Sequence, residues 1–371
     1  MAQTDLIKRI RLYKSRIRLR EPFVISLGSI THAENVIVLV ETASGLQGFG
    51  ECSPFMTIHG ESMESAFIAG RYLAAQLKNK DALALEARQQ DMNTVMFGNA
   101  SIKSAFDIAL HDVASLSSGM PLYAFLGGKK NKPIVTDYTV SIGEPAKMAS
   151  DALQIIENGF SIIKVKLGGS GADDVERIRR IRLAVGDEPL LRIDANQGWK
   201  SHDAVGILKA LHPFGIQHCE EPIPRWDFME LPRISNESPI PIMADESCFD
   251  HHDAKRLIGM KACNLLNVKL GKSAGILNAM KITRLAEKAG VYLQAGGFLE
   301  SRIGFTATAH FATVSDHIRF FDFDTPLMFE HDPMLGGISY HKGGMIEIPD
   351  ENGLGTRPDE SYLRELDSME I

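Results

Sequence analysis

The stretch SIIKVKLGG, Ser161 to Gly169, has the composition of a buried strand that also carries two lysines. Its other positions form the β-branched and apolar run of a strand covered on both faces, namely Ile162, Ile163, Val165 and Leu167. Lys164 and Lys166 are two residues apart, so both ammonium groups project to the same face. Because lysine is almost never fully buried without a partner, we expect anionic groups on that face.

This strand is one of eight that we predict from Lys130 onward, with amphipathic segments such as ADDVERIRRIRLAVG between them. The predicted strands are VTDYTVSI, SIIKVKLG, LLRIDAN, IQHCEEP, PIMADES, LLNVKLG, VYLQAGGF and HIRFFDFD. Repeated strand–helix units are typical of a (β/α)8 barrel, which we expect over residues 126–332. A doubly wound open sheet is the alternative, but no Gly-x-Gly-x-x-Gly follows the first strand.

The segments on either side of the barrel do not follow the strand–helix repeat. VIVLVET and LQGFGECSPF, joined by ASG, predict an antiparallel hairpin, and SIKSAFDIALHDVASLSSG has apolar residues at helical spacing. We therefore expect an α+β capping domain over residues 1–125. The turn-rich segment 333–371 is expected to return to that domain.

The composition narrows the class of protein. The 371 residues are 44% hydrophobic and 23% charged, and the net charge of −7 is spread along the chain, which argues against a nucleic-acid partner. No apolar run approaches the roughly 20 residues that cross a bilayer, and the N-terminus lacks the apolar core of a signal peptide. Four scattered cysteines without zinc-like spacing are expected to be reduced, as in a cytoplasmic protein: Cys52, Cys219, Cys248 and Cys263.

Five charged residues fall at the carboxyl ends of consecutive predicted strands. Successive members are 28, 26, 25 and 24 residues apart, which is one strand–helix unit each time: Lys166, Asp194, Glu220, Asp245 and Lys269. The groups therefore occupy neighbouring strands at the same height, at the end of the barrel where catalytic groups lie. Any one of them alone would be read as a salt-bridged or solvated residue, but five in phase with the repeat indicate a site.

The three acids of this set predict a metal site. Converging carboxylates repel one another unless a cation lies among them, and oxygen ligands without clustered His or Cys favour Mg²⁺, with Mn²⁺ as a substitute. We expect Asp194, Glu220 and Asp245 to hold the ion. The neighbouring Glu221 and Glu246 should point to the other side of their strands and make structural contacts.

The two lysines of this set predict proton transfer. Lys166 and Lys269 would flank a bound substrate from opposite sides, and we expect burial, the metal and the nearby cation to lower the pKa of each. Lys166 is then a base, and Lys164 a cationic neighbour that faces the anion of the substrate. Removal of a proton α to a carboxylate gives an enediolate, whose second negative charge a metal ion stabilises.

At this point the sequence resembles the muconate-lactonizing subgroup of the enolase superfamily. The matching pieces are KVK, DANQGW, CEEP, ADES and NVKLGKSAG, with FDIALHDVASLSSGMPLYAFLGG before the barrel. The resemblance spans nearly the whole chain. It implies a barrel capped by an N-terminal α+β domain, an acid–base pair and three ligands for the metal: Lys166 and Lys269, then Asp194, Glu220 and Asp245.

Within this subgroup, the stretch FFDFDTPLM resembles the dipeptide epimerases. Asp322 and Asp324 are two apart on the eighth predicted strand and would point the same way, as a site for a cation. In that family the pair holds the α-ammonium group of the substrate, and the resulting polarity fits a dipeptide but repels a muconate. The resemblance also implies contacts to the substrate carboxylate and along the peptide: Thr139 and Lys164, then Gly297 and Leu299.

One departure from the family bears on the second residue of the dipeptide. Ala-Glu epimerases have an arginine in a capping loop, whereas the corresponding stretch PFVISLGSITHAE has Gly28 there and no Lys or Arg nearby. An unpaired glutamate carboxylate beside Phe23, Ile25 and Leu27 would be costly to bury. We therefore expect Ala-Xaa dipeptides in which Xaa is small or hydrophobic.

Other functions stay open at this stage. The same scaffold supports muconate cycloisomerisation, o-succinylbenzoate synthesis and N-acylamino acid racemisation, and none of these substrates has a free ammonium for Asp322 and Asp324. A barrel that binds a metal or ligand without catalysis would not need two desolvated lysines. The expected partner is a small dipeptide. Barrels of this family often assemble, so the resemblance also allows a homo-oligomer.

Overall fold

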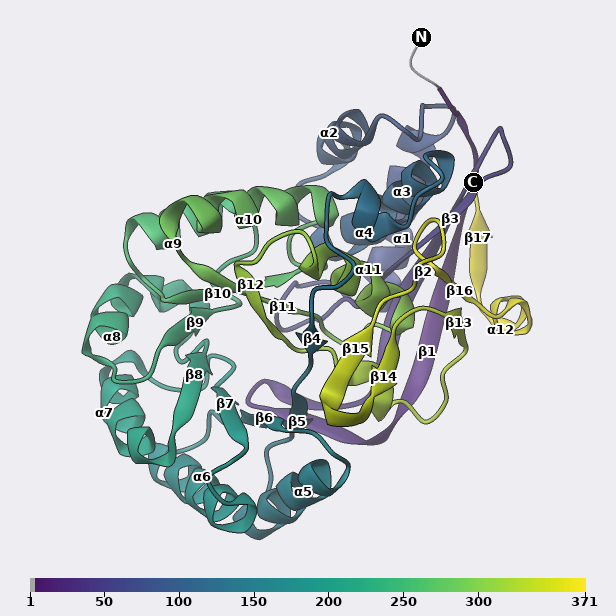
Figure 1. Ribbon diagram of the computed structural model, residues 1–371. Coiled ribbons are helices and arrows are strands. Elements are labelled where there is room, and N and C mark those ends of the chain that lie inside the picture. The colour runs from purple at the N-terminus through teal and green to yellow at the C-terminus, as the bar shows by residue number, and fades with distance from the viewer. Residues whose placement is uncertain (1–3) are drawn as a thin grey trace.

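Two long antiparallel strands begin the fold, which a computed structural model describes for residues 4–371 (Figure 1). β1 (Ile7–Ile25) and β2 (Gly28–Thr42) form a hairpin with Ser26 and Leu27 at its tip, and β3 (Gln47–Cys52) pairs with β2. Residues 1–3 of the predicted capping domain lie outside the described range. The helices of this part are α1 (Met63–Leu77), α2 (Leu85–Val95), α3 (Ala100–Ser117) and α4 (Leu122–Phe125).

Both faces of the middle of β2 are buried. Val36, Val38 and Val40 of β2 pack with α1 and α3, whereas Ile37 and Leu39, which alternate with them, join the core of the barrel. Successive residues of a strand point to opposite faces, so the uninterrupted apolar run VIVLV contributes to both cores. The sheet therefore fixes the capping part against the barrel.

The predicted (β/α)8-type barrel with an N-terminal α+β capping part is confirmed. All eight predicted strands belong to one sheet, in chain order and parallel: β5 (Tyr138–Val140), β6 (Ile162–Lys166), β7 (Leu190–Asp194), β8 (Ile216–Glu220), β9 (Ile242–Ala244), β10 (Leu265–Lys269), β11 (Tyr292–Gly296) and β12 (Ile318–Phe321). The helices that follow the strands are α5 (Pro145–Glu157), α6 (Gly171–Val185), α7 (Ser201–Leu211), α8 (Leu231–Glu237), α9 (His251–Gly259), α10 (Ile276–Ala289) and α11 (Arg302–Ala312). In Figure 1 the helices α5 to α10 form the outer layer.

The first and last strands of the barrel meet at a weakly bonded seam. Within residues 4–371 no ladder pairs β5 with β12. Instead, the N–H of Asp137, just before β5, donates to the carbonyl of Phe321 at 3.3 Å. The N–H of Phe323 donates to Oγ1 of Thr136 at 2.8 Å. The sheet thus curls round on itself, and its closure depends on a few bonds beside the strands.

The C-terminal segment contacts both parts of the chain. Its last strand β17 (Ser368–Glu370) pairs with β1 in the N-terminal sheet. Its strand β15 (Met345–Glu347) lies between β14 (Ser339–His341) and β4 (Ile134–Val135) and pairs with both, beside the barrel. The other elements of the segment are β13 (Met334–Gly336), β16 (Thr356–Pro358) and α12 (Glu360–Glu365). The boundaries predicted after residues 125 and 332 fall at the end of α4 and just before β13.

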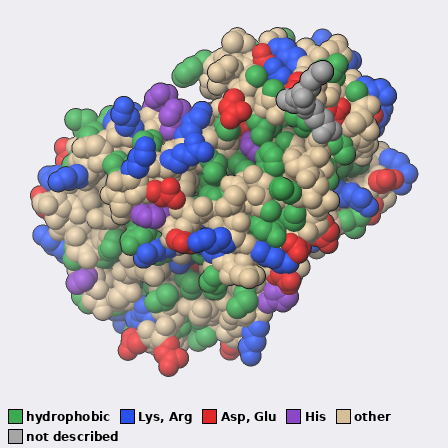
Figure 2. Space-filling model, turned by 45° about the horizontal axis from the view of Figure 1, so that its top comes forward, with side chains coloured by type: hydrophobic (Ala, Val, Ile, Leu, Met, Phe, Trp, Pro, Cys, Tyr) green, Lys and Arg blue, Asp and Glu red, His purple; other side chains and the backbone are tan. Residues whose placement is uncertain are grey.

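The structure also contains four short 3-10 helices within residues 4–371, and its surface carries charges of both signs (Figure 2). The 3-10 helices are η1 (His212–Phe214), η2 (Arg225–Glu230), η3 (Thr325–Met328) and η4 (Lys342–Gly344). Basic and acidic side chains are interspersed over the face drawn in Figure 2. In the part of the chain that the structure covers, every helix is too short or too polar to traverse a bilayer.

Gly48 and Gly50 of β3 let α3 lie directly on that strand, and Gly50 provides a test of the packing. A Cβ at Gly50 would lie 1.9 Å from the carbonyl oxygen of Ala105, whereas one at Gly206 in α7 would meet nothing within 4 Å. We expect Gly50→Ala to lower the free energy of unfolding by about 2 kcal/mol or more, because the helix must move. The matched control Gly206→Ala should raise it by about 0.5 to 1 kcal/mol. Urea denaturation measures both, and an unchanged Gly50→Ala would contradict this packing.

Candidate active site

The five charged residues predicted from the strand–helix period lie together at one end of the barrel. Lys166, Asp194, Glu220 and Lys269 are the last residues of β6, β7, β8 and β10, and Asp245 directly follows β9. The register places Lys166 beside Asp194 and Asp194 beside Glu220. Parallel neighbouring strands of matched register end at the same height, so these side chains converge on the barrel mouth.

Each predicted metal ligand is fully buried and paired with a lysine. Asp194 accepts from Nζ of Lys166 at 2.7 Å, and Asp245 accepts from Nζ of Lys269 at 2.7 Å. Glu220 accepts from Nζ of Lys164 at 2.8 Å. Burial alone would raise the pKa of Asp245, but the charges of Lys269 and Lys272 hold that pKa far below its usual range. For Glu220, burial and the charge of Asp194 raise the pKa.

The chemistry of this donor set fits a hard divalent cation. Three carboxylates end on adjacent strands without a His or Cys among them, which is the ligand type that Mg²⁺ prefers. Their oxygens are nevertheless more widely spaced than those of a second acidic group in the barrel. Among the described residues, only Asp137, Asp322 and Asp324 form a group of three whose carboxylate oxygens all lie within 4.8 Å of one another.

Lys164, predicted to face the substrate anion, is buried among the acids and is not one of the residues that line the pocket at the barrel mouth. It is 1% exposed, and its Nζ lies 2.8 Å from Glu220, 2.7 Å from Asp322 and 3.2 Å from Asp194. The reason is the pleat of β6: residues two apart share a face, but Lys164 lies one repeat deeper than Lys166. Burial would lower the pKa of Lys164, yet the three carboxylates raise it well above its usual value. Its place is beneath the pocket, as a counter-ion for the acids.

Lys166 and Lys269 line a single pocket at the barrel mouth. The pocket is also lined by aromatic and aliphatic side chains from the capping part, namely Phe23, Ile25, Phe55 and Ile58. The lowered pKa expected for the two lysines depends on a metal ion among the acids, and beside the carboxylates alone the pKa of Lys269 shifts the other way. Burial lowers its pKa, but the charges of Asp245 and Glu220 outweigh burial and raise it. The strength of an ion pair depends on side-chain contacts that the sequence does not show.

Asp322 and Asp324 also line this pocket, although not from the strand predicted for them. β12 ends at Phe321, so both aspartates lie in the loop that leads to η3. Asp322 accepts from Lys164, and Oδ2 of Asp324 accepts from the N–H of Thr139 at 2.7 Å. Burial favours the neutral form of each, but Lys164 lowers the pKa of Asp322 to about 2. Burial and the charge of Asp322 raise the pKa of Asp324 to about 7.

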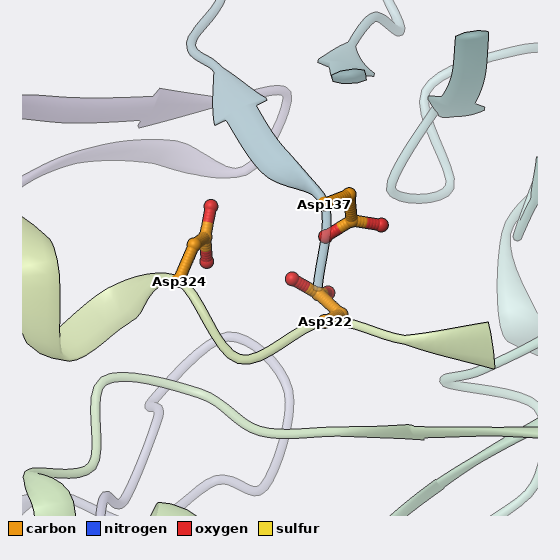
Figure 3. A group of neighbouring side chains, drawn as sticks. All are labelled: Asp137, Asp322 and Asp324. Atoms are coloured by element: carbon orange, nitrogen blue, oxygen red, sulfur yellow. The ribbon is translucent and has the colours of Figure 1, made fainter. Parts of the chain in front are cut away.

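A third aspartate beside this pair has no counterpart in the sequence-based prediction. Figure 3 shows Asp137 next to Asp322, with Asp324 further along the loop that carries Asp322. Oδ2 of Asp137 accepts from Nη1 of Arg192 at 2.7 Å, while its buried Oδ1 has no hydrogen-bond partner among the described residues. Burial and the charge of Asp322 raise the pKa of Asp137 well above its usual value. The aspartate adds acidic character to the side of the pocket at the seam.

The remaining predicted contact residues also lie at this pocket. Thr139, Gly297 and Leu299 line it. Gly297 has no room for a side chain, because a Cβ there would lie 2.6 Å from the ring of Phe305. Leu299 is held by the capping part, since its carbonyl accepts from Nδ2 of Asn35 at 2.8 Å. The loop after β11 therefore offers the pocket an ordered strip of backbone.

The capping hairpin reaches over the barrel mouth. Phe23 and Ile25 line the pocket, as expected, but Leu27 and Gly28 line a neighbouring hollow instead. Near the tip, Oγ of Ser26 donates to the carbonyl of Asn196 in the barrel at 2.6 Å. β1 ends at Ile25, so Leu27 lies in the turn of the hairpin and no longer follows the alternation that directs Phe23 and Ile25 to the mouth.

Sequence reasoning missed residues that support the acids. Lys272 donates to a side-chain oxygen and to the carbonyl of Asp245, and its only signal was the second lysine of the motif NVKLGK. Nδ2 of Asn267 donates to Glu220 at 2.8 Å from the strand that carries Lys269. Glu221 makes structural contacts of the expected kind, since it accepts from the N–H of Asp245 at 2.6 Å. The neighbouring Glu246 accepts from Nδ2 of Asn196 at 3.3 Å.

Comparison with known proteins agrees with this architecture. Residues 7–127 match the family described as mandelate racemase / muconate lactonizing enzyme, N-terminal domain, and residues 147–362 match the enolase C-terminal domain-like family. The D-Ala-D/L-Ala epimerase of Cytophaga hutchinsonii is 58% identical over 98% of this chain and 99% of its own. The L-Ala-D/L-Glu epimerase of Bacillus subtilis is 39% identical over 94% of this chain and 96% of its own.

A solved structure extends the likeness to three dimensions. The crystal structure of the dipeptide epimerase from Cytophaga hutchinsonii, complexed with Mg and the dipeptide D-Ala-L-Val, has a TM-score of 0.98 with this chain. The two are 58% identical, and the match covers 99% of this chain and 100% of the other. From its two family matches, its relatives and its fold, this chain belongs to the mandelate racemase / muconate lactonizing enzyme family of the enolase superfamily.

Proposed function

We propose that this protein is a Mg²⁺-dependent dipeptide epimerase that inverts the α-carbon of the second residue of Ala-Xaa dipeptides. The observation that carries the proposal is the placement of Lys166 and Lys269 in one pocket. β6 and β10 are separated by β7, β8 and β9 on one side and by β11, β12 and β5 on the other. In a curled sheet, the two lysines therefore stand on opposite sides of the mouth, as a 1,1-proton transfer requires.

The acids give the pocket the polarity of a dipeptide. Asp322 and Asp324 would hold the α-ammonium group at the seam side of the pocket, where both line it. Asp194, Glu220 and Asp245 would hold the Mg²⁺. Bound there, the ion supplies positive charge that stabilises the negative charge developing on the substrate carboxylate as the α-proton leaves. Dipeptides carry both an ammonium and a carboxylate, whereas muconates and N-acylamino acids lack the ammonium.

The two lysines divide the proton transfer between the two faces of the α-carbon. One lysine, as the neutral amine, takes the α-proton and becomes an ammonium. The other lysine, as the ammonium, delivers a proton to the opposite face and becomes the neutral amine. The Cα–H bond on one face is thus replaced by a Cα–H bond on the other, and the configuration inverts. The reverse reaction uses the same two groups with their roles exchanged.

The lining of the pocket supports a neutral second residue. Ile25, Phe55, Ile58 and Phe298 are apolar, and the cations among the lining residues are Lys166 and Lys269 alone. Both lysines are assigned to the reacting centre, so a glutamate side chain would have no partner for its charge, which is costly to bury. A relative that is a D-Ala-D/L-Ala epimerase agrees with a small second residue.

The lysine pair provides the main test of the function. Lys166→Ala and Lys269→Ala should each abolish epimerisation of alanyl dipeptides, because inversion needs a group on both faces. Each variant should still exchange the α-hydrogen of one epimer with deuterium from D2O. The epimer that exchanges in Lys166→Ala should be the one that does not exchange in Lys269→Ala. Mass spectrometry and NMR in D2O measure both rates. Absence of exchange with every alanyl dipeptide in the wild type would overturn the proposed function.

The acidic pair provides a second test, in which Asp324→Asn is the informative change. The amide keeps the shape of the side chain but removes its charge, so kcat/KM for D-Ala-L-Ala should fall by about 10- to 100-fold. N-acetyl-D-Ala-L-Ala, which has no ammonium, serves as the matched substrate. The preference of the wild type for the free dipeptide should shrink in the variant, and an equal loss on both substrates would contradict a role in binding the ammonium.

Side-chain specificity provides a third test. D-Ala-D-Ala, D-Ala-L-Val and D-Ala-L-Glu, with their L-Ala counterparts, can be compared under one set of conditions. We expect kcat/KM for the neutral second residues to exceed that for glutamate by at least about tenfold, the cost of one weakly paired polar group. Activity much higher on Ala-Glu than on Ala-Ala would contradict the neutral pocket and leave the epimerase function itself intact.

A further inference from the structure

Lys269 lies against a cluster of aromatic rings, here called the roof, which is formed by Phe298 of the barrel and by Phe55 and His59 of the capping part. Its Nζ is 4.6 Å from the centre of the Phe298 ring, within the range of a cation–π contact. The ring of His59 packs edge-on against Phe298, with centroids 4.5 Å apart and planes at 63°. Phe55 also contacts Phe298, at 5.9 Å. Asp245 thus holds the ammonium by charge, and the roof limits where it can move.

The roof is itself fixed by hydrogen bonds. The N–H of Phe298 donates to Glu300 at 2.5 Å, and its carbonyl accepts from Oγ1 of Thr325 at 2.9 Å. Nδ1 of His59 accepts from the N–H of Phe55 at 3.1 Å. The loop before His59 is bound to the barrel, because Nη1 of Arg225 donates to the carbonyl of Ile58 at 2.7 Å. Contacts therefore run without a gap from the loop Phe55–His59 to Lys269.

His59 has features that packing alone does not require. Since Nδ1 accepts a hydrogen bond, the hydrogen of the neutral ring is on Nε2, and this buried atom has no hydrogen-bond partner among the described residues. Burial, and then the charges of Lys269 and Lys272, lower the pKa of His59 to about 3. The ring is therefore neutral at ordinary pH and adds no repulsion beside Lys269.

Lys166 has a separate aromatic contact on the opposite side of the mouth. Its Nζ is 5.7 Å from the centre of the Phe23 ring, which belongs to the capping hairpin. The hairpin is bonded to the barrel beside Phe23, where the carbonyl of Val24 accepts from the N–H of Ile142 at 3.0 Å. One segment of the capping part thus contacts Lys166 directly through Phe23, and another supports Lys269 indirectly, through Phe298 of the barrel.

From these contacts we infer that His59, through Phe298, is a positioning residue for Lys269 and that Phe23 is a positioning residue for Lys166. The capping part then aligns the two lysines, one on each face of the α-carbon, independently of each other. This inference rests on the proposed function, since it assigns one lysine to each face of the α-carbon. Its signature is asymmetry: a change at His59 should impair proton transfer on one face and spare the other.

Exchange of the α-hydrogen in D2O measures each face by itself. The Lys269-dependent epimer is defined as the one whose exchange is lost in Lys269→Ala, and the Lys166-dependent epimer as the one lost in Lys166→Ala. The probes are the alanyl-alanine diastereomers with the wild-type protein and Mg²⁺. The ratio of the two exchange rates is taken from one preparation, so it does not depend on how much of a variant is folded.

His59→Ala should shift this ratio by about tenfold or more against the Lys269-dependent epimer, because small displacements of a reacting group cost large factors in rate. His59→Phe, which restores a ring against Phe298, should return the ratio most of the way to that of the wild type. Phe23→Leu is the matched control on the other face and should shift the ratio in the opposite direction. Phe298→Leu repeats the test at the ring that touches Lys269.

The outcomes separate the inference from the function on which it rests. If the wild type exchanges neither epimer, the proposed function fails. If the wild type exchanges both, but His59→Ala and Phe298→Leu leave the ratio unchanged or shift it toward the Lys269-dependent epimer, only the positioning role is overturned. A ratio that moves in opposite directions for His59→Ala and Phe23→Leu supports independent alignment of the two lysines.

Discussion

The balance of buried charge at the barrel mouth is the constraint on which the rest of this structure depends. Four lysines there are at most 6% exposed, namely Lys164, Lys166, Lys269 and Lys272. A buried ion costs several kcal/mol unless it is paired, so these lysines and the acids around them are stable only as a set. Lys164 illustrates this best, because it contacts three carboxylates and still does not line the pocket. The acids at the pocket thus depend on buried lysines that do not line it, namely Lys164 and Lys272.

The capping part does more than cover this charged layer. Asn35 bonds both Glu51 of β3 and the carbonyl of Leu299, so one buried amide links the N-terminal sheet to the backbone of the pocket. Glu51 in turn accepts from the N–H of Ser301, the residue before α11. The same sheet packs Ile37 and Leu39 into the core of the barrel. The pocket is therefore built at an interface that cannot open without exposing both polar and apolar groups.

Much of the fold and of the site could be predicted because both follow the strand–helix period. That period places Lys166, Asp194, Glu220, Asp245 and Lys269 on successive strands, and the structure brings them together there. Contacts between distant segments have no such signal. Examples are the roof of His59 and Phe298, the pairing of Asp137 with Arg192, and the support of Asp245 by Lys272. The effect of Asp245 and Glu220 on the pKa of Lys269 is another example, since it depends on how closely two carboxylates approach.

The seam between β5 and β12 separates two groups of functional residues in the barrel. The lysines and the predicted metal ligands stand on strands that are laddered on both sides, whereas Asp137, Asp322 and Asp324 lie where the ladder is absent. A change of sequence at the seam disturbs few backbone bonds, whereas a change on β7 or β8 disturbs two ladders. Residues that recognise the ammonium end of the substrate can therefore change during evolution while the residues that transfer the proton are kept. New specificities can arise at the seam, where the fewest backbone hydrogen bonds join neighbouring strands.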